Sequence, residues 1–263
     1  MIQPAVAPIL SIAGLTKRFG GLTAVDNLTL DLAPGRLHAI IGPNGAGKTT
    51  LFNLISGFLP SDEGRVFFAG QEITGLKPHK ISRLGISRTL QVKSVFSQLS
   101  VRDNLWITAQ AKHGVMNPFR PTSSYRDTCE KVERVLEQLD LGALADRQAG
   151  TLSYGDIALL EIGMAIAAEP RLLLLDEPIC GMSPAETERT VVKIRELAQT
   201  IDIVLIEHDM EVVFDIADDI TVMAQGAILA SGSPKEIAAD ERVREAYLGR
   251  PEDEDYTEEA AHA

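Results

Sequence analysis

The sequence predicts an α/β fold in which a helical segment interrupts a core of strands and helices. Three observations lead to this prediction. Short runs rich in β-forming residues come first and are separated by Gly and Pro, as in an antiparallel meander. After Gly150 strands and helices alternate, which indicates a parallel sheet covered by helices. Between these regions, residues 91–150 have a mainly helical pattern. A chain of 263 residues is long enough to bury a large core.

The individual elements follow from apolar runs and from the turn residues that bound them. A helical pattern from 101 to 139 is broken at 113–124, where Pro and Ser residues mark a loop. The other expected elements, in chain order, are strands at 9–15, 28–32 and 37–41, a helix at 48–56, a helix at 153–168, a strand at 172–176, a helix at 184–200 and a strand at 203–207.

The domain organisation is predicted as a core made of residues 1–90 and 151–250, with residues 91–150 inserted as a helical subdomain. The last segment, 251–263, reads PEDEDYTEEAAHA and contains six acids without Lys or Arg. Such a composition buries too little apolar surface to become ordered, so we expect a disordered acidic tail.

Charge and composition exclude several classes of protein. The chain has 25 basic and 37 acidic residues, a net charge of −12, of which the tail contributes −6. A nucleic-acid binder needs a basic face, so we expect no nucleic-acid partner. No apolar run reaches the roughly 20 residues that span a bilayer, and the first residues do not resemble a signal peptide. With only two cysteines we expect neither disulfides nor a cysteine metal site, and a cytoplasmic location.

A phosphate-binding loop is predicted at residues 42–49, which read GPNGAGKT and match G-x-x-x-x-G-K-[ST]. The motif follows an apolar strand and precedes a helix, which is the context it requires. Its glycines let backbone N–H groups converge on phosphate oxygens, and the helix N-terminus adds a favourable dipole. Lys48 should reach the β and γ phosphates, and Thr49 should offer its hydroxyl to Mg²⁺. The expected nucleotide-binding residues are Gly42, Pro43, Asn44, Gly45, Ala46, Gly47, Lys48, Thr49 and Thr50. The fold class is thus a P-loop (RecA-like) α/β core with an antiparallel β-subdomain and an inserted α-helical subdomain.

Two adjacent acids end the apolar strand RLLLLDE at 171–177. Because successive strand side chains point to opposite faces, we expect the two acids to have different tasks. Asp176 is expected to bind the Mg²⁺ shell, and Glu177 to orient and deprotonate the attacking water. His208 follows another apolar strand in IVLIEHD, and only its place among the other motifs makes a catalytic role preferable to a structural one.

With these motifs the chain resembles the nucleotide-binding subunits of ABC transporters. LSYGD at 152–156 looks like the signature segment usually written LSGGQ. Gln91 looks like the Q-loop glutamine, which implies catalytic and metal-binding roles, and Phe19 looks like the aromatic residue that stacks on adenine. The order of Phe19, Lys48, Gln91, Ser153, Glu177 and His208 is that of the family, over residues 9–231.

The resemblance implies a head-to-tail dimer of two ATP-binding subunits, either identical or sister chains. Each ATP would lie between the phosphate loop of one subunit and the signature segment of the other. Ser153 and the backbone at Gly155 open a helix, whose N-terminus can hold the γ-phosphate of the partner's nucleotide. Hydrolysis of ATP would then open the dimer and move the membrane subunits.

Two departures from the family pattern bear on this expectation. Asp156 stands where the signature has Gln, and Tyr154 stands where it has Gly. Ser153 and Asp156 have capping-box spacing, so we expect Asp156 to cap the helix start. The second departure is ICGMSP after Glu177, where Ser183 replaces the Asp of many relatives and puts the usual contact across the dimer in doubt.

The segments GISRTLQVKSVFSQLSVRDNL and DEPICGMSPAE and the insertion HGVMNPFRPTSSY resemble the ATPases of branched-chain amino acid importers. Urea and amide importers share these features, as does the lipopolysaccharide-exporter ATPase to a lesser degree. This branch implies two integral membrane permease subunits, a periplasmic substrate-binding protein, and a peripheral position on the cytoplasmic face of the inner membrane.

Two surface features have alternative interpretations. In the family the region after Gln91 receives a helix of the membrane subunit, but its apolar side chains could equally face the core of the helical segment. That region contains Val92, Val95, Phe96 and Leu99. A basic stretch without acids could face the membrane or be an ordinary solvated face. It contains Lys77, Lys80, Arg83, Arg88 and Lys93.

Two further classes of protein are weighed. An ABC ATPase that acts on nucleic acid or ribosomes should show coiled coils, a second cassette or a basic surface, and the sequence shows none of these. A phosphate-loop kinase or GTPase would leave LSYGD and His208 unexplained, and the guanine-reading N-K-x-D is absent from the sequence. A transport ATPase accounts for all of the motifs.

Overall fold

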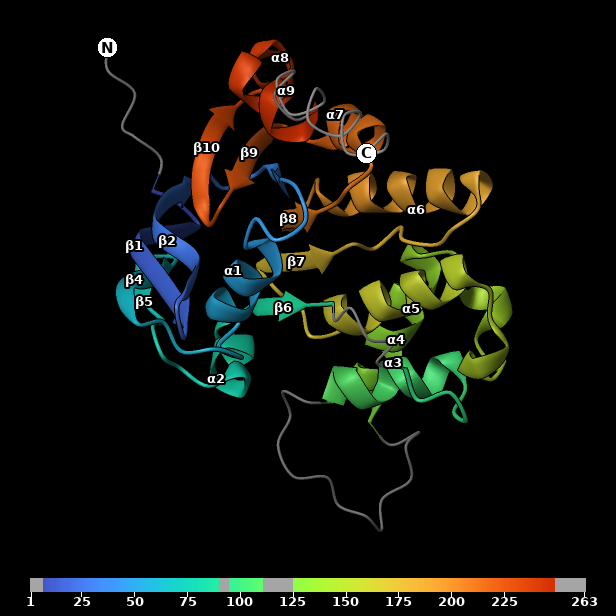
Figure 1. Ribbon diagram of the computed structural model, residues 1–263. Helices are drawn as coiled ribbons and strands as arrows, with labels where there is room; N and C mark the ends of the chain where they lie inside the picture. Colours follow the sequence, from blue (N-terminus) through green and yellow to red (C-terminus); the bar gives the residue numbers. More distant parts are fainter. Residues whose placement is uncertain (1–6, 90–94, 111–124, 249–263) are drawn as a thin grey trace, which may run out of the picture. The chain divides into compact units, whose positions relative to one another are not determined.

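The computed structural model describes residues 7–89, 95–110 and 125–248 (Figure 1). These residues form two compact units. Of the described residues, unit 1 contains 7–75 and 208–248, and unit 2 contains 76–89, 95–110 and 125–207. The predicted division into a core, a helical subdomain and a tail stays a prediction, and its tail segment lies outside the described residues.

An antiparallel sheet in unit 1 has the strand order β2-β1-β4-β5. The long strands β1 (Leu10–Phe19) and β2 (Leu22–Leu32) form a hairpin, and β4 (Glu63–Phe68) and β5 (Gln71–Glu72) extend it. Both long strands exceed the predicted ranges, because cross-strand pairing carries the ladder through polar residues. Lys17 pairs with Val25, and Arg18 pairs with Thr23. The predicted antiparallel β-region is confirmed.

The remaining strands of unit 1 are β3 (Leu37–Ile41), β9 (Asp219–Ala224) and β10 (Ala227–Gly232). β3 pairs parallel with β9, and β10 pairs antiparallel with β9. All five residues of β3 are buried, as expected for a parallel strand covered on both faces. The helices of this unit are α1 (Lys48–Ile55), α7 (Met210–Ile216), α8 (Pro234–Ala239) and α9 (Glu241–Leu248).

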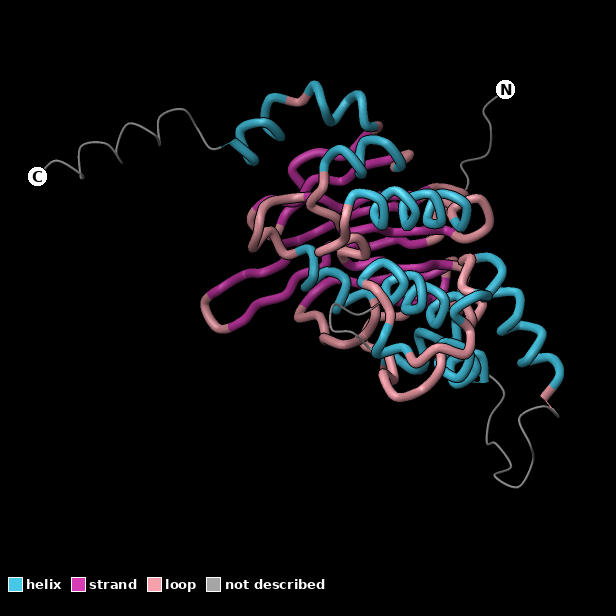
Figure 2. Tube along the Cα trace, turned by 90° about the vertical axis from the view of Figure 1, so that its right-hand side faces the viewer, coloured by secondary structure: helices cyan, strands magenta, loops and turns pink. Residues whose placement is uncertain are grey.

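Unit 2 has three parallel strands, in the order β8-β7-β6. They are β6 (Ile86–Arg88), β7 (Leu172–Asp176) and β8 (Asp202–Ile206). Figure 2 shows the strands of the described chain in magenta and its helices in cyan. The three helices α3, α4 and α5 contact one another, and α5 also contacts α6. The helices are α2 (Pro78–Leu84), α3 (Val101–Gln110), α4 (Arg126–Gln138), α5 (Tyr154–Ile166) and α6 (Pro184–Leu197), with 3₁₀ turns at Gly142–Leu144 and Ala149–Thr151.

The helices and the parallel strands expected from the sequence are therefore confirmed, with ends that differ by a few residues. The expected loop at 113–124 lies outside the described residues. Within the described part of the chain, no helix is long and apolar enough to cross a membrane.

Candidate functional site

The phosphate loop of unit 1 is shaped by two glycines, Gly42 and Gly47, whose positions leave no room for a Cβ. The backbone φ angle is 152° at Gly42 and 98° at Gly47, values that side chains with a Cβ rarely adopt. A Cβ on Gly42 would lie 2.1 Å from the carbonyl oxygen of Met223, and one on Gly47 would lie 2.2 Å from that of Ala24. The loop backbone thus runs directly against neighbouring strands, and it turns into α1 at Lys48.

Lys48 is held across the mouth of this loop. Its side chain is buried, and Nζ donates to the carbonyl oxygens of Gly42 at 2.6 Å and Pro43 at 3.1 Å. An ammonium group has three N–H donors, so it can exchange a carbonyl for a phosphate oxygen at small cost. Thr49 and Thr50 follow on the first turn of α1 and are half-buried, while Asn44 and Gly45 are exposed. The structure thus forms the predicted loop between β3 and α1 and places Lys48 across it, and the phosphate-binding role of these residues stays a prediction.

Tyr247 on α9 is a neighbour of the loop that the sequence did not suggest. Its hydroxyl accepts a hydrogen bond from the backbone N–H of Gly42, while burial raises the pKa of Tyr247 to about 12. The hydroxyl is therefore protonated at neutral pH. The C-terminal helix of unit 1 thus contacts the first residue of the phosphate loop.

Phe19 ends β1 and presents its ring to solvent, with 46% of the residue exposed. The Nζ atom of Lys17 lies 5.5 Å from the ring centroid, and it also forms an ion pair with Asp62 at 2.9 Å. An exposed ring with one cationic neighbour is suited to stacking on a planar base.

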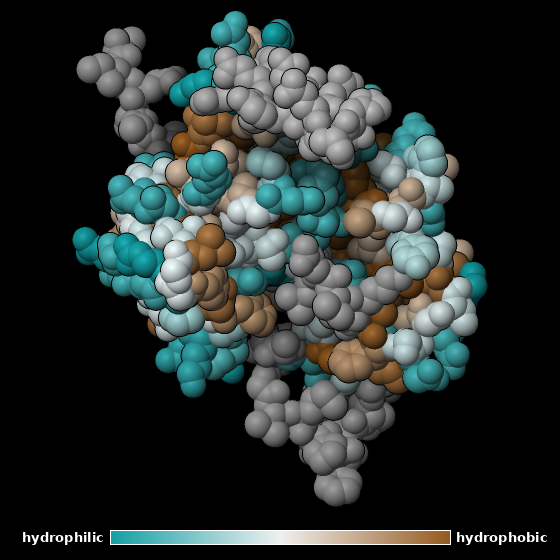
Figure 3. Space-filling view, viewed as in Figure 1, coloured by the Kyte–Doolittle hydropathy of each residue, from teal (hydrophilic) through white to brown (hydrophobic). Residues whose placement is uncertain are grey.

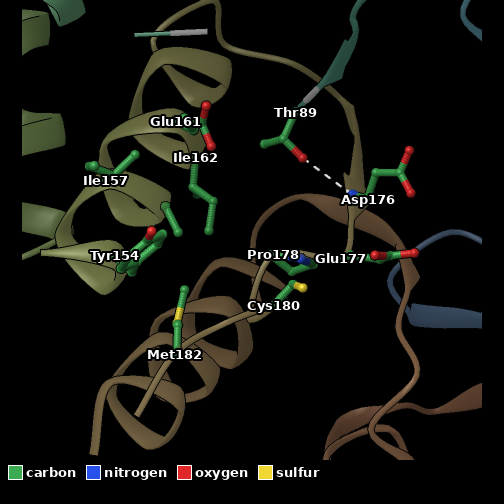
Figure 4. Close-up of a pocket in the computed structure, with 11 residues that line it drawn as sticks. Thr89, Tyr154, Ile157, Glu161, Ile162, Asp176, Glu177, Pro178, Cys180 and Met182 are labelled. Carbon is green, nitrogen blue, oxygen red and sulfur yellow. Dashed lines mark hydrogen bonds between the residues drawn. The ribbon is translucent and has the colours of Figure 1, made fainter. Parts of the chain in front are cut away.

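In unit 2, Asp176 ends the buried strand β7 and forms an ion pair that the sequence did not suggest. Nη2 of Arg88 lies 2.8 Å from Oδ2 of Asp176, and the two side chains are 7% and 0% exposed. The backbone N–H of Asp176 donates to the hydroxyl of Thr89 at 3.3 Å, as Figure 4 shows. The assignment of Arg88 to a solvated or membrane-facing basic stretch was wrong, because β6 places this side chain beside β7.

Glu177 does not continue the strand. β7 ends at Asp176, and Glu177 has a φ angle of 53°, in the left-handed region. The expectation that strand alternation separates the two acids was therefore wrong, since the backbone turns at this point. Such a conformation costs on the order of 1–3 kcal/mol and is concentrated at functional sites. The backbone N–H of Glu177 donates to the carbonyl oxygen of Ile206 at 2.9 Å, and this hydrogen bond fixes the turn.

A cavity of about 300 Å³ lies between α5 and the loop that follows Glu177. In Figure 4 the side chains of Asp176 and Glu177 extend away from α5, while residues of α5 line the opposite wall. Met182 and Pro178 close the cavity from the loop side, and Cys180 contributes an exposed thiol. The acids, the loop and the start of α5 thus share one region of unit 2.

The signature segment begins α5, and Ser153 is its N-cap residue. The hydroxyl of Ser153 accepts from the N–H of Asp156 at 3.2 Å and lies 3.1 Å from Oδ2 of the same residue. Nη1 of Arg189 lies 2.9 Å from the other carboxylate oxygen of Asp156. The side chain of Asp156 turns back to the helix start, as expected, but it bonds the hydroxyl of Ser153 and not its backbone N–H, so Ser153 is the cap and the capping role of Asp156 stays a prediction. Arg189 offsets the charge of Asp156.

Glu186 on α6 also contacts this segment, and the sequence analysis missed it. Oε1 of Glu186 accepts from the backbone N–H of Gly155 at 3.1 Å, and Oε2 accepts from the N–H of Ser183 at 3.0 Å and from its hydroxyl at 2.7 Å. These hydrogen bonds, first that of the Ser183 hydroxyl, lower the pKa of Glu186 to about 2. The spacing of Ser183 and Glu186 is that of a capping box, which was a signal available in the sequence.

His208 and Gln91 complete the predicted set. His208 is exposed, and along the chain it follows β8 and precedes α7, as expected for a residue after a strand. Gln91, Val92 and Lys93 lie outside the described residues.

Phe96 and Leu99 are 49% and 36% exposed, so the alternative that they face the core of the helical segment was wrong. On the face seen in Figure 3, hydrophobic residues are interspersed with hydrophilic ones.

A buried strand, a glycine-built loop and a helix that begins at a lysine define a P-loop nucleotide-binding protein. The comparisons with known proteins identify the family. The family model described as ABC transporter matches residues 25–180, and the model described as Branched-chain amino acid ATP-binding cassette transporter matches residues 227–253. The chain belongs to the ABC transporter family and is an ATP-binding cassette ATPase.

Curated relatives match nearly the whole chain. The high-affinity branched-chain amino acid transport ATP-binding protein BraF of Pseudomonas aeruginosa is 41% identical, over 92% of this chain and 98% of the relative. The corresponding protein LivG of Escherichia coli is 40% identical, over the same shares of the two chains. The resemblance stated from the motifs is therefore confirmed.

Solved structures confirm the fold. An ATP-binding cassette of an ABC transporter superposes with a TM-score of 0.83 at 34% identity, over 93% of this chain and 100% of that one. A crystal structure of the ADP conformation of an ATP-binding cassette superposes with a TM-score of 0.80 at 35% identity and the same coverage. The predicted P-loop fold and the use of a nucleotide are thus both supported.

Proposed function

We propose that this chain is the ATP-hydrolysing motor subunit of an importer for branched-chain, hydrophobic amino acids. The observation that carries the proposal is the agreement, over 92% of the chain, with relatives named as branched-chain amino acid transport ATP-binding proteins. The match at residues 227–253 supports the same branch from a segment outside the phosphate loop and the signature. These names favour amino acid import over urea or amide import, lipopolysaccharide export, and action on nucleic acid.

In this proposal ATP binds at the phosphate loop and at Phe19. The loop amides of residues 42–49 surround the β and γ phosphates, and Lys48 exchanges a loop carbonyl for a phosphate oxygen. The exposed ring of Phe19 stacks on adenine. Both features belong to unit 1, and Asn44 and Gly45 of the loop and the ring of Phe19 are exposed.

The residues proposed for the metal fit Mg²⁺ in their chemistry. Thr49 offers a hydroxyl, Asp176 offers a carboxylate, and Gln91 offers an amide oxygen. Among the described residues there is no group of three or more His, Cys, Asp or Glu that could hold a metal. Mg²⁺ characteristically uses one or two protein carboxylates together with substrate phosphates, and Asp176 supplies one such carboxylate. When bound, the ion would neutralise charge on the phosphates.

Glu177 is the proposed general base. At Glu177 the backbone leaves the extended conformation of β7, with a φ of 53°, so its carboxylate does not continue the alternation of the strand. The hydrogen bond from the Glu177 N–H to the carbonyl oxygen of Ile206 holds this turn. The carboxylate then accepts a proton from the water that attacks the γ-phosphate. His208 and Gln91 are proposed to orient the phosphate and the water.

The signature segment is proposed to complete the site of a second ATP-binding subunit. Ser153 and the N–H of Gly155 lie in the first turn of α5, where the helix dipole favours an anion. ATP would thus join two subunits, and hydrolysis would release them. The partner is a second copy or a sister chain.

Two integral membrane permease subunits are the proposed partners that receive the motion of the two ATP-binding subunits. A periplasmic substrate-binding protein would deliver the substrate to these permeases. The exposed side chains of Phe96 and Leu99 support an apolar contact on unit 2. Such a contact would place the chain on the cytoplasmic face of the inner membrane without insertion into it.

The test pairs two substitutions. Lys48→Ala should abolish ATP binding, while Glu177→Gln should bind ATP and lose turnover by about 10²–10⁴, the scale for a positioned base. Isothermal titration measures binding, and phosphate release measures turnover. Glu188→Gln, an exposed glutamate on α6, is the matched control and should retain activity. Turnover close to wild type in Glu177→Gln would contradict its role as base.

The transport part of the proposal needs vesicles that contain the chain and its permeases. ATP-driven uptake of radiolabelled leucine, absent with Lys48→Ala, is the expected result. Uptake of urea in place of leucine would contradict the proposed substrate while leaving the ATPase role intact.

A further inference from the structure

The carboxylate of Glu186 bridges two segments of unit 2. Oε1 accepts from the N–H of Gly155 in the signature segment at 3.1 Å, and Oε2 accepts from the N–H and hydroxyl of Ser183 at the start of α6. A Cβ on Gly155 would lie 2.9 Å from Cβ and 3.0 Å from Cγ of Glu186, so the approach requires glycine. The two helices are thus joined at their N-termini through one side chain.

The Glu186 carboxylate accepts the hydrogen bond of the Gly155 N–H. In the proposed function the γ-phosphate of the partner subunit's ATP accepts a hydrogen bond from the same N–H. Gly155 is the second residue of α5, and its N–H is one of the helix-start donors without a partner inside the helix. A charge-assisted hydrogen bond is roughly twice as strong as a neutral one. One N–H cannot make a good bond to two anions, and a carboxylate beside a phosphate repels it.

From this geometry, and resting on the proposed function, we propose that Glu186 is a positioning residue that occupies the Gly155 N–H until the γ-phosphate of the partner subunit's ATP displaces it. The Ser183 bonds hold Oε2 while Oε1 is released, so the side chain remains anchored during the exchange. Glu186 then sets the ATP concentration at which two subunits associate, and it keeps the signature helix in place in the absence of a partner.

A second capping box in the chain provides an internal comparison. α8 begins with Ser233 and Pro234, and Oε2 of Glu236 accepts from the Ser233 N–H at 2.8 Å and from its hydroxyl at 2.7 Å. Glu186 makes the same pair of bonds to Ser183, and Pro184 follows in the same way. The bond from Oε1 to Gly155 distinguishes Glu186. Because a capping box accepts Gln as well as Glu, both helices should tolerate that substitution.

The experiment measures ATP-driven dimerisation by sedimentation velocity in the full chain carrying Glu177→Gln, which prevents turnover. Adding Glu186→Gln should lower the ATP concentration at half-maximal dimerisation about tenfold, because a neutral amide oxygen competes less with phosphate. Adding Glu236→Gln, which removes the same charge from the same kind of cap, should leave that concentration unchanged. ATP binding by the single subunit, measured by titration, should be equal in all three proteins.

A second measurement tests the bond itself in the nucleotide-free chain. In ¹⁵N-glycine-labelled protein, Glu186→Gln should move the amide signal of Gly155 upfield, and Glu236→Gln should not. An unchanged or higher ATP requirement for dimerisation, or an unchanged Gly155 signal, would overturn the inference, as would the absence of any dimer while ATP is bound. Failure of the Glu177→Gln chain to bind ATP would instead count against the proposed function.

Discussion

Replacement of Arg88 by Met should destabilise the protein strongly, because it leaves a buried carboxylate without its ion-pair partner. The side chains of Arg88 and Asp176 are 7% and 0% exposed, and Nη2 lies 2.8 Å from Oδ2. Removing one member of a buried pair costs about 3–5 kcal/mol, since the other charge remains desolvated. Met preserves much of the apolar stem, so lost packing contributes little.

That cost is a large part of the roughly 5–15 kcal/mol by which typical proteins are stable. Urea unfolding followed by circular dichroism, without nucleotide, measures the loss. With a slope of about 2 kcal/mol per molar urea, a loss of about 4 kcal/mol moves the midpoint down by about 2 M. Arg36→Met is the control, because its pair with Asp219 is 50% and 30% exposed and should contribute about 1 kcal/mol or less.

The double variant Arg88→Met with Asp176→Asn provides the deciding comparison. If the loss arises from an uncompensated charge, Asn should recover a substantial part of it, as a coupling between neighbouring sites. A loss in Arg88→Met no larger than in Arg36→Met, or no recovery in the double variant, would refute the reasoning.

Two further predictions concern unit 1. Burial lowers the pKa of His38 to about 4. Above about pH 6.5 the His38 side chain is neutral in both the folded and the unfolded protein, so it does not change the free energy of unfolding with pH. Between about pH 6.5 and 4 only the unfolded chain binds the proton, so the free energy of unfolding falls as the pH falls. His38→Gln should remove up to about 3 kcal/mol of this fall, seen as a flatter dependence of the unfolding free energy on pH, and the exposed His79→Gln should not. Phe19→Ala should raise the KM for ATP about tenfold and leave kcat unchanged, because stacking acts equally on ground and transition states. Leu22→Ala, at the residue that pairs with Phe19 and is 67% exposed, should change neither, and a fall in kcat with Phe19→Ala would contradict the stacking role.

The sequence predicted the local structure of the phosphate loop better than that of the acidic pair Asp176 and Glu177. The phosphate loop is a local structure, in which glycines, the preceding strand and the following helix are adjacent in the chain, so its motif predicted its form. Asp176 at the end of β7 and Glu177 next to it were found for the same reason. The alternation rule failed at Glu177, because a hydrogen bond to Ile206, far along the chain, helps to fix a turn that the local sequence does not require.

Contacts between residues that are far apart along the chain were not predicted from the sequence. Arg88 was grouped with its basic neighbours along the chain, yet parallel pairing of β6 with β7 places it against Asp176. Glu186 lies 31 residues from Gly155 and Tyr247 lies more than 200 from Gly42, so spacing rules that work within one helix turn give no information about either pair.

By itself the sequence determined the class of protein, because motifs that bind phosphate are built from consecutive residues whose backbone form follows from their own chemistry. The period of its apolar residues also predicted five of the strands, β1, β2, β3, β7 and β8, and the helices of the inserted segment and of the second half, whereas β4, β5, β6, β9 and β10 were not predicted. The tertiary structure decided which charges are buried and which are paired. Arg88 with Asp176 and Glu186 with Gly155 depend on how strands and helices pack, and burial and electrostatic pairing are properties of residues close in space, whatever their separation along the chain.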